Sequence, residues 1–169
     1  RDQKYYDNDN WRGTWKLDGG VVSNQASHHL DLLRTIMGDP ISVYAKASNH
    51  IAKIQCEDTA LIIFKFKNKK TAIMEATTAM RPKNIEGSLS ILGTKGSAKI
   101  GGFALNKIEY YNVSDKVNIS KYSTKPKNVY GFGHLKFYEH VINAISKKIN
   151  SEFECKEALK TVKIINAIY

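Results

Sequence analysis

Residues 59–80, TALIIFKFKNKKTAIMEATTAM, carry the strongest strand pattern in the chain. In its first half, apolar residues alternate with more polar ones at Ala60, Ile62, Phe64 and Phe66. A period of two is typical of a strand with one buried face. Asn68-Lys69 predicts a turn into a second run, Thr71–Met80, so the stretch indicates two strands joined by a short connection.

More period-two runs follow, with no helix between them. They are Ser88–Gly93, Ser97–Ile100 and Leu105–Tyr111, the first two joined around Thr94-Lys95-Gly96. Arg81-Pro82-Lys83-Asn84 interrupts the pattern, and the polar residues 113–130 predict a loop with an edge strand. Sequential strands of this kind predict one predominantly antiparallel, open sheet.

Helices are expected on both sides of the strand region. Apolar stripes at steps of three and four predict a helix to about Met37 and two helices at the end of the chain. The stripes are Val22, Ala26, Leu30, Leu33 and Met37; Leu135, Tyr138, Ile142, Ile145 and Ile149; and Leu159, Val162, Ile165 and Tyr169. Residues 1–18 lack a period and indicate an extended segment or loop.

The predicted fold class is therefore α+β, with the helices covering one face of the sheet. The other face carries Leu61, Ile63 and Ile73, which is more apolar surface than water favours. Such a surface is typical of a contact between proteins, so we expect a homo-oligomer through the open sheet face.

Composition describes an ordinary globular chain with a strong positive charge. Lys and Arg outnumber Asp and Glu by 26 to 16, a net charge of +10, which permits a nucleic-acid partner. The basic residues are mostly Lys and are spread along the chain, which favours solvated faces over a nucleic-acid footprint. We expect no nucleic-acid partner.

Nothing in the sequence predicts a membrane span or a signal peptide. Cys56 and Cys155 are far apart and indicate a reducing compartment, so we expect a cytoplasmic protein without a membrane partner. The chain opens at Arg1 without Met and stops at Tyr169 inside an apolar stripe, from which we expect a piece of a longer protein.

Three polar residues recur on the first predicted helix. Asn24, His28 and Asp31 follow the spacing i, i+4 and i+7, which places them on one helix face. An imidazole beside a carboxylate suits proton transfer to a substrate hydroxyl, and a solvated helix face is the alternative. His28-His29 with Asp31 is a poor metal set, because adjacent His side chains diverge and no Cys or Glu cluster supports them, so no metal site is predicted.

Trp11-Arg12-Gly13-Thr14-Trp15 combines a guanidinium with two aromatic rings. Arg pairs with carboxylate or phosphate oxygens and the rings offer stacking planes, although a surface Arg packed on Trp is an equal alternative. Gly131-Phe132-Gly133 and the pair Gly93 and Gly96 lack the strand-to-helix context of a dinucleotide fingerprint.

Two groups of motifs carry a resemblance to a known family. The first is Tyr5-Tyr6, Trp11-Arg12-Gly13-Thr14-Trp15, Asp18-Gly19-Gly20, Asn24-Gln25, His28 and Asp31-Leu32-Leu33. The second is Thr77-Thr78-Ala79, Arg81-Pro82-Lys83-Asn84, Glu86-Gly87, Ile91-Leu92-Gly93, Lys95-Gly96, Gly133-His134 and Ala167-Ile168-Tyr169. Together they resemble the C-terminal domain of the Gfo/Idh/MocA oxidoreductases over nearly the whole chain.

The resemblance implies a single α+β substrate-binding and oligomerisation domain over residues 1–169, without the N-terminal Rossmann domain that binds NAD or NADP. Its details are most similar to the branch that oxidises UDP-N-acetylglucosaminuronic acid at C3 in surface-polysaccharide (lipopolysaccharide) synthesis. The family's catalytic lysine, in an E-K-P motif, is absent from this sequence. We therefore expect the chain alone to lack dehydrogenase activity and tight NAD binding.

The resemblance also implies roles for individual residues. The family motif D-x-G-x-H-x-x-D corresponds to Asn24, Ala26, His28 and Asp31, with Asn and Ala standing where many members carry Asp and Gly. His28 and Asn24 are the implied catalytic residues. The implied substrate-binding residues are Arg12, Thr14, Asn24, Gln25, His28 and Asp31, and the implied cofactor contacts are Trp11 and Arg12. A cofactor-free sugar-binding or assembly module and a basic nucleic-acid-binding domain are the alternative functions.

Overall fold

The computed structural model describes residues 1–82, 87–102, 104–114, 118–126, 131–151 and 153–169. Lys83, Asn84 and Glu86 of the sequence motifs lie outside these ranges. The chain forms two compact units, the first from Arg1–Asn84 with Phe153–Tyr169 and the second from Ile85–Glu152.

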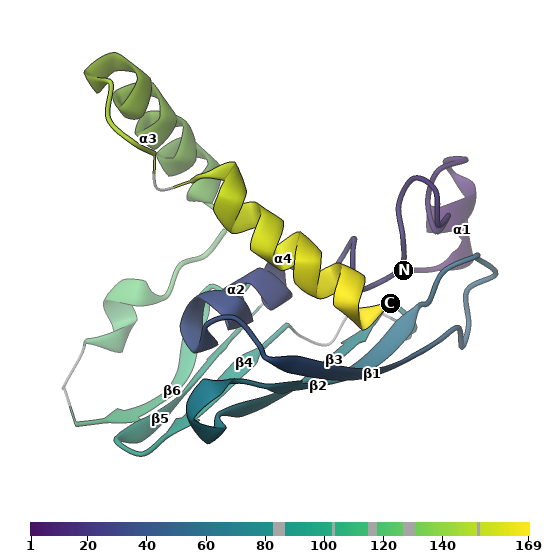
Figure 1. Ribbon diagram of the computed structural model, residues 1–169, viewed down its shortest axis with the longest axis horizontal. Helices are drawn as coiled ribbons and strands as arrows, with labels where there is room; N and C mark the ends of the chain where they lie inside the picture. Colours follow the sequence, from purple (N-terminus) through teal and green to yellow (C-terminus); the bar gives the residue numbers. More distant parts are fainter. Residues whose placement is uncertain (83–86, 103, 115–117, 127–130, 152) are drawn as a thin grey trace. The chain divides into compact units, whose positions relative to one another are not determined.

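The first unit contains a three-stranded antiparallel sheet in the order β1-β2-β3 (Figure 1). Its strands are β1 (Ser42–Ser48), β2 (Thr59–Lys65) and β3 (Thr71–Thr77). A short 3-10 turn, η1 (Lys67–Lys69), joins β2 to β3, with Asn68 and Lys69 at φ values of 58° and 60°. The two strands and the turn predicted from residues 59–80 are therefore confirmed.

Alternation along β2 separates a buried face from an exposed one. The predicted inward residues are fully buried: Ala60, Ile62, Phe64 and Phe66. On the other face the register aligns Tyr44 with Ile63 and Ile63 with Ile73, and these three side chains are 70%, 50% and 78% exposed. The open apolar face expected from the sequence is present in this unit.

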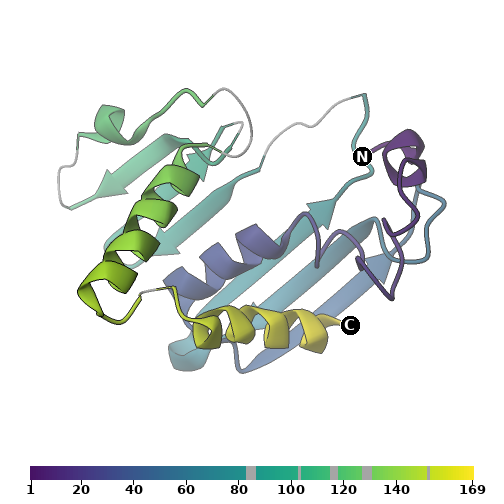
Figure 2. The ribbon, with the colours of Figure 1, turned by 90° about the horizontal axis from the view of Figure 1, so that it is seen from above.

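Two helices, α2 (Ser27–Met37) and α4 (Cys155–Ile168), lie side by side over the buried face of this sheet (Figures 1 and 2). The expected α2 stripe is buried at Val22, Ala26, Leu30 and Leu33. On α4 the buried residues are Thr161, Ile164 and Ile168, whereas Leu159 and Val162 of the predicted stripe are about half exposed. The position of α4 was predicted correctly but its packing face was not.

A polar network explains why Thr161 lies on the buried face of α4. Arg34 on α2 pairs with Glu157 at 3.2 Å and donates to the hydroxyl of Thr161 at 3.1 Å. Asp31, also on α2, accepts a short hydrogen bond from the same hydroxyl. Because hydrogen bonds satisfy these groups, a polar residue replaces the apolar one that helical periodicity predicts.

The N-terminal segment also differs from its prediction. Residues 1–18 include a short helix, α1 (Gln3–Asp7), where a loop or extended segment was expected. Asp2 caps this helix by accepting from the Tyr5 backbone N–H at 2.9 Å, and Tyr6 buries its ring. A side-chain cap of this kind stabilises a helix too short to show periodicity.

The second unit contains an antiparallel sheet in the order β4-β5-β6. Its elements are β4 (Leu89–Gly93), β5 (Gly96–Gly101), β6 (Lys107–Val113), the 3-10 turn η2 (Ile119–Tyr122) and α3 (Gly133–Lys147). The hairpin around Gly96 and the helix are confirmed; in the described parts of 113–130 there is no strand beyond the end of β6. Each apolar residue of the predicted α3 stripe is at least half exposed, Leu135, Tyr138, Ile142, Ile145 and Ile149.

The α+β class and the antiparallel pairing are confirmed, but the described strands pair in two three-stranded sheets where we expected one. Two features of the described residues that follow β3 disfavour further strand pairing there. The Ala79 N–H donates to the Thr77 hydroxyl at 3.0 Å, and Pro82 has no N–H to offer a neighbouring strand. In the described part of the chain no helix is long and apolar enough to cross a membrane.

A buried carboxylate organises the loop that leads into β2. Asp58 is fully buried, and its carboxylate accepts from the backbone N–H groups of His50, Ile51 and Ala52 at 2.8–2.9 Å and from the Thr59 hydroxyl at 3.0 Å. Burial alone would raise the pKa of Asp58. The four donors outweigh burial and bring this pKa below its ordinary value of 3.8.

Replacing this carboxylate should destabilise the protein. Asp58→Asn is expected to lower the free energy of unfolding by about 3 kcal/mol, because an amide NH2 would face backbone donors. In the wild type, the contribution of Asp58 is complete above its unfolded-state pKa of about 3.9 and is lost as pH falls through the lower folded-state pKa. Urea unfolding followed by circular dichroism between about pH 7 and pH 2 measures both effects. The exposed Asp7→Asn variant is the control, and equal stability of the two variants at neutral pH would contradict the assignment.

Candidate functional site

The loop before α2 carries most of the predicted site residues, and Gly13 anchors it. The Gly13 carbonyl accepts from the backbone N–H groups of Gln55 and Cys56 at 3.0 and 3.2 Å. Gly13 has a φ of +68°, and a Cβ there would lie 2.8 Å from Ile54. Only glycine therefore fits, and the Arg12–Thr14 segment is held against residues 54–56.

Arg12 is held mainly by the protein itself. Its guanidinium donates to the Tyr5 carbonyl at 2.8 Å, pairs with Asp9 at 2.9 Å and lies over the Tyr5 ring, 4.1 Å from its centroid. Arg12 Nε is buried without a hydrogen-bond partner among the described residues. An anionic ligand would compete with Asp9 for this guanidinium, whereas the neighbouring Trp11 is 40% exposed and open to a ligand.

Thr14 and Gln25 lie near the same loop and are half-buried. The Thr14 hydroxyl donates to the Trp11 carbonyl at 2.7 Å. The Gln25 amide donates to the Tyr5 hydroxyl at 3.4 Å. Tyr5, which the sequence offered only as part of the family resemblance, therefore contacts both Arg12 and Gln25.

The sequence pattern predicted Asn24 on the first helix. In the structure Asn24 lies just before α2, which begins at Ser27. The helical pattern is interrupted here, because the Ala26 N–H bonds to the Val21 carbonyl five residues back, at 2.8 Å. The Asn24 side-chain NH2 donates a short hydrogen bond to Asp18 Oδ1. Asp18 Oδ2 accepts from the Gly13 N–H at 2.7 Å, so a single carboxylate joins Asn24 to the Arg12–Thr14 segment.

The two histidines on α2 differ in environment. His28 is exposed, whereas His29 is half-buried. Burial, with a smaller contribution from the charge of His28, lowers the pKa of His29 below its ordinary value of 6.5. His29 is therefore neutral at neutral pH, and His28 is the more exposed histidine of the pair.

Asp31 is not gathered with the other predicted site residues. Its carboxylate accepts from Thr161 of α4 and from Arg34 at 3.4 Å. These contacts give Asp31 a role in joining α2 to α4, beside any contact with a substrate. The structure thus brings Arg12, Asn24 and Gln25 together through Tyr5 and Asp18, with His28 exposed on the adjoining helix.

A second carboxylate lies beneath this loop and was missed by the sequence reasoning. Glu57 is 5% exposed, and its Oε1 accepts from the Val22 N–H at 3.0 Å and from the Tyr169 hydroxyl at 2.9 Å. A Cβ at Gly20 would overlap this carboxylate, which explains the glycine there. Glu57 thereby joins the end of α4 to the turn that carries Asn24.

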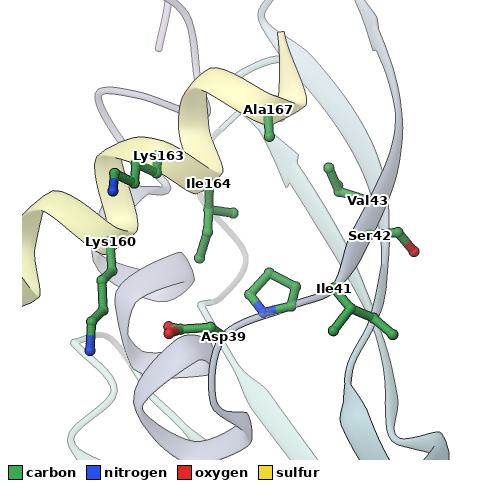
Figure 3. Close-up of a pocket in the computed structure, with 9 residues that line it drawn as sticks. Asp39, Ile41, Ser42, Val43, Lys160, Lys163, Ile164 and Ala167 are labelled. Atoms are coloured by element: carbon green, nitrogen blue, oxygen red, sulfur yellow. The ribbon is translucent and has the colours of Figure 1, made fainter.

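The cavity shown in Figure 3 is a separate feature of the first unit. It has a volume of about 430 Å³ and lies between α4 and the segment from the end of α2 into β1. Its lining includes Asp39, Ile41, Lys160 and Ile164 but none of the predicted site residues. The candidate site is therefore not this cavity. It is the polar surface of the loop that carries Arg12, Thr14, Asn24 and Gln25, hereafter the polar loop surface.

The described residues lack the clustered ligands of a metal site and the backbone motif of a pyrophosphate site. Within the described ranges, no three His, Cys, Asp or Glu side chains form a group that could hold a metal ion. Gly19-Gly20 precede α2, but turns and no strand lead into them, so they do not build the pyrophosphate-binding unit of a Rossmann domain. Of the predicted cofactor contacts, Trp11 has exposed ring surface that could stack on a planar group.

The family model described as "Oxidoreductase family, C-terminal alpha/beta domain" (GFO_IDH_MocA_C) matches residues 1–169. The chain therefore belongs to the Gfo/Idh/MocA oxidoreductase family, as its C-terminal domain. No curated protein matches the chain.

Solved structures of this family share the fold. The chain is 36% identical to the WlbA dehydrogenase from Bordetella pertussis, with a TM-score of 0.93, and 38% identical to the Chromobacterium violaceum enzyme, with a TM-score of 0.89. Both were solved with NADH and UDP-GlcNAcA, and the match covers 100% of this chain but 50% and 48% of theirs. A Thermotoga maritima oxidoreductase at 23% identity and a TM-score of 0.71, covering 98% of this chain and 46% of its own, shows the fold alone.

Cys56, under the Gly13 loop, is not a nucleophile. Burial raises the pKa of its thiol to about 11, with the Glu57 and Asp18 charges adding to the effect, whereas Cys155 is exposed. With a thiol reagent such as DTNB near neutral pH, we expect one fast-reacting thiol and a second that reacts only on unfolding. Cys155→Ser should remove the fast phase and leave the slow one. Two thiols reacting at one rate would contradict this burial.

Proposed function

We propose that this chain is the substrate-binding domain of an NAD-dependent sugar-nucleotide dehydrogenase that oxidises the C3 hydroxyl of UDP-N-acetylglucosaminuronic acid. The observation that carries the proposal is the full-length match of this domain, at 36–38% identity, to two dehydrogenases solved with NADH and UDP-GlcNAcA. The polar loop surface around Asn24 and His28 supports it, because it offers hydrogen-bonding groups suited to a sugar. A role in surface-polysaccharide synthesis, in the cytoplasm, belongs to the same proposal, with the two free thiols as support for a reducing compartment.

The reaction divides between the cofactor and this domain. When bound, the nicotinamide of NAD accepts the hydride from the sugar carbon. His28 orients the reacting hydroxyl and takes part in its proton transfer, together with the lysine that the family resemblance assigns to the other half of the enzyme. His28 suits this role because it is exposed on α2, beside the loop that carries Asn24.

The remaining residues bind and orient the substrate. Arg12 pairs with the sugar carboxylate or a phosphate oxygen by exchanging its contact with Asp9, and Trp11 with Arg12 contacts the cofactor. Thr14, Asn24 and Gln25 form hydrogen bonds with sugar hydroxyls or the acetamido group. Asp31 supports the site indirectly, because its contacts with Arg34 and Thr161 hold α2 against α4.

His28→Ala and His29→Ala in the full-length enzyme test the catalytic assignment. We expect His28→Ala to lower kcat by about 10²–10⁴-fold, the usual range for general acid–base catalysis. KM should change less, because Arg12 and the hydroxyl contacts still bind the substrate. His29→Ala, the matched control, should cost much less. Steady-state NADH formation with UDP-N-acetylglucosaminuronic acid and NAD measures both variants.

Two results would contradict this assignment. Near-wild-type rates in both variants would remove His28 from the mechanism, and a larger loss at His29 would transfer the role to the half-buried ring. Absence of any turnover by the wild-type enzyme with this sugar nucleotide would contradict the proposed substrate.

We further propose that the protein assembles as a homo-oligomer through the open face of the β1-β2-β3 sheet. The support is the cross-strand row of Tyr44, Ile63 and Ile73 with the neighbouring Leu61, each at least half exposed. Burying this row against a second copy removes apolar surface from water on both partners.

Ile73→Lys tests this assembly. A charge on β3, within the proposed interface, would have to be desolvated, so we expect the oligomer to dissociate into monomers, measured as particle mass by light scattering. Leu92→Lys, on the exposed side of β4, is the control and should leave the mass unchanged. A wild-type protein that stays monomeric at high concentration, or an unchanged mass for Ile73→Lys, would overturn the interface.

A further inference from the structure

We propose that Asp18 is a positioning residue that fixes the side-chain amide of Asn24, so that Asn24 presents its carbonyl oxygen to the substrate and not its NH2 group. The proposal rests on the proposed function, and it deepens it by assigning the kind of substrate group that Asn24 recognises.

The orientation of the amide follows from hydrogen-bond chemistry. An ionised carboxylate can only accept hydrogen bonds, whereas an amide has one accepting and one donating end. Because the Asn24 side chain lies within hydrogen-bond distance of Asp18 Oδ1, its NH2 end must face Asp18. The carbonyl end then points away from Asp18.

The carboxylate cannot easily turn to accept a different arrangement. Its second oxygen accepts from the Gly13 N–H at 2.7 Å, so each oxygen has its own donor. The Asp18 backbone is held as well, because its carbonyl accepts from the Ser23 hydroxyl at 2.9 Å. Gly13 is in turn fixed by its hydrogen bonds to residues 55 and 56. The orientation of Asn24 is therefore imposed by the folded loop before a substrate arrives.

Asn24 Oδ1 is left as an acceptor for a ligand. Among the described residues, no hydrogen bond is made to this oxygen, although the side chain is half-buried. An acceptor with a fixed direction selects a donor, and a sugar hydroxyl or the N–H of an acetamido group is such a donor. Asn24 thus accepts a hydrogen bond from the substrate close to His28.

Exchanging the two side chains tests this assignment in the full-length enzyme. In Asp18→Asn, the single amide oxygen can accept from the Gly13 N–H or from the Asn24 NH2 but not from both with separate oxygens. We therefore expect kcat/KM to fall by about 10- to 100-fold. Asn24→Asp places two carboxylates face to face, and we expect a similar loss that diminishes at lower pH, where a shared proton restores the hydrogen bond.

The double variant Asp18→Asn with Asn24→Asp restores the pairing. The Asn introduced at position 18 accepts from Gly13 with its oxygen and donates with its NH2 to the new carboxylate at position 24, which still offers an acceptor to the substrate. We expect kcat/KM to recover to within about threefold of wild type. Asp7→Asn, exposed at the end of α1 and outside the hydrogen bonds of Asp18 and Asn24, is the control and should keep the wild-type rate.

A second measurement does not depend on activity. In ¹⁵N-labelled enzyme, the side-chain NH2 signals of Asn24, assigned by their loss in Asn24→Ala, should shift in Asp18→Asn but not in Asp7→Asn. An unshifted Asn24 signal in Asp18→Asn, or a double variant as slow as the slower single variant, would overturn the proposal. If the wild type does not turn over UDP-N-acetylglucosaminuronic acid, the proposed function fails, and the amide signal still decides whether Asp18 orients Asn24.

Discussion

Two adjacent buried carboxylates at the entry to the central strand, Glu57 and Asp58, constrain the first unit of this domain. Burying a carboxylate is costly unless hydrogen bonds replace the water it loses. Asp58 obtains its donors from the loop at residues 50–52, and Glu57 obtains donors for its Oε1 from Val22 and Tyr169, whereas its Oε2 is buried without a partner among the described residues. The strand, the preceding loop, the turn before α2 and the end of α4 are therefore held together at one point.

The candidate site is an extension of this arrangement. The backbone of Gln55 and Cys56, immediately before Glu57, fixes Gly13, and Gly13 is bound to Asp18, which is bound to Asn24. Each step uses a backbone group or a carboxylate with few alternative partners, so the polar surface is ordered before a ligand binds. Preorganised polar groups of this kind orient a substrate with little loss of entropy. Such a domain can supply orientation in a reaction whose electrons are carried by a nicotinamide.

Two surfaces of the domain remain apolar and exposed. The outer face of the β1-β2-β3 sheet presents a cross-strand row, and α3 of the second unit presents an apolar stripe. The chain spans about half the length of the dehydrogenases it resembles. Exposed apolar surface of this extent is typical of contacts between proteins. The sheet face is the surface for which we have proposed such a contact.

Elements with local sequence signals were predicted correctly. The period of two in residues 59–80 and the stripe at Leu30 and Leu33 indicate which side chains are buried, and the structure buries them. The turn at Asn68 is likewise marked by its own residues. The family motifs also identified the segment from Trp11 to Asn24, because their spacing is a property of the chain alone, although Asn24 was expected on the helix and lies before its start at Ser27. The exposed row through Ile63 and Ile73 was visible for the same reason.

The pairing of polar groups far apart in sequence could not be predicted and is defined by the folded chain. Thr161 replaced an apolar residue on the packing face of α4 because it meets Asp31, which lies 130 residues away in sequence. Asp18, Glu57 and Tyr5 gained their roles in the same way, through donors brought to them by other loops. Hydrophobic periodicity reports the amount of burial at each position, whereas a hydrogen bond depends on two directed groups meeting, and that meeting exists only in the folded chain.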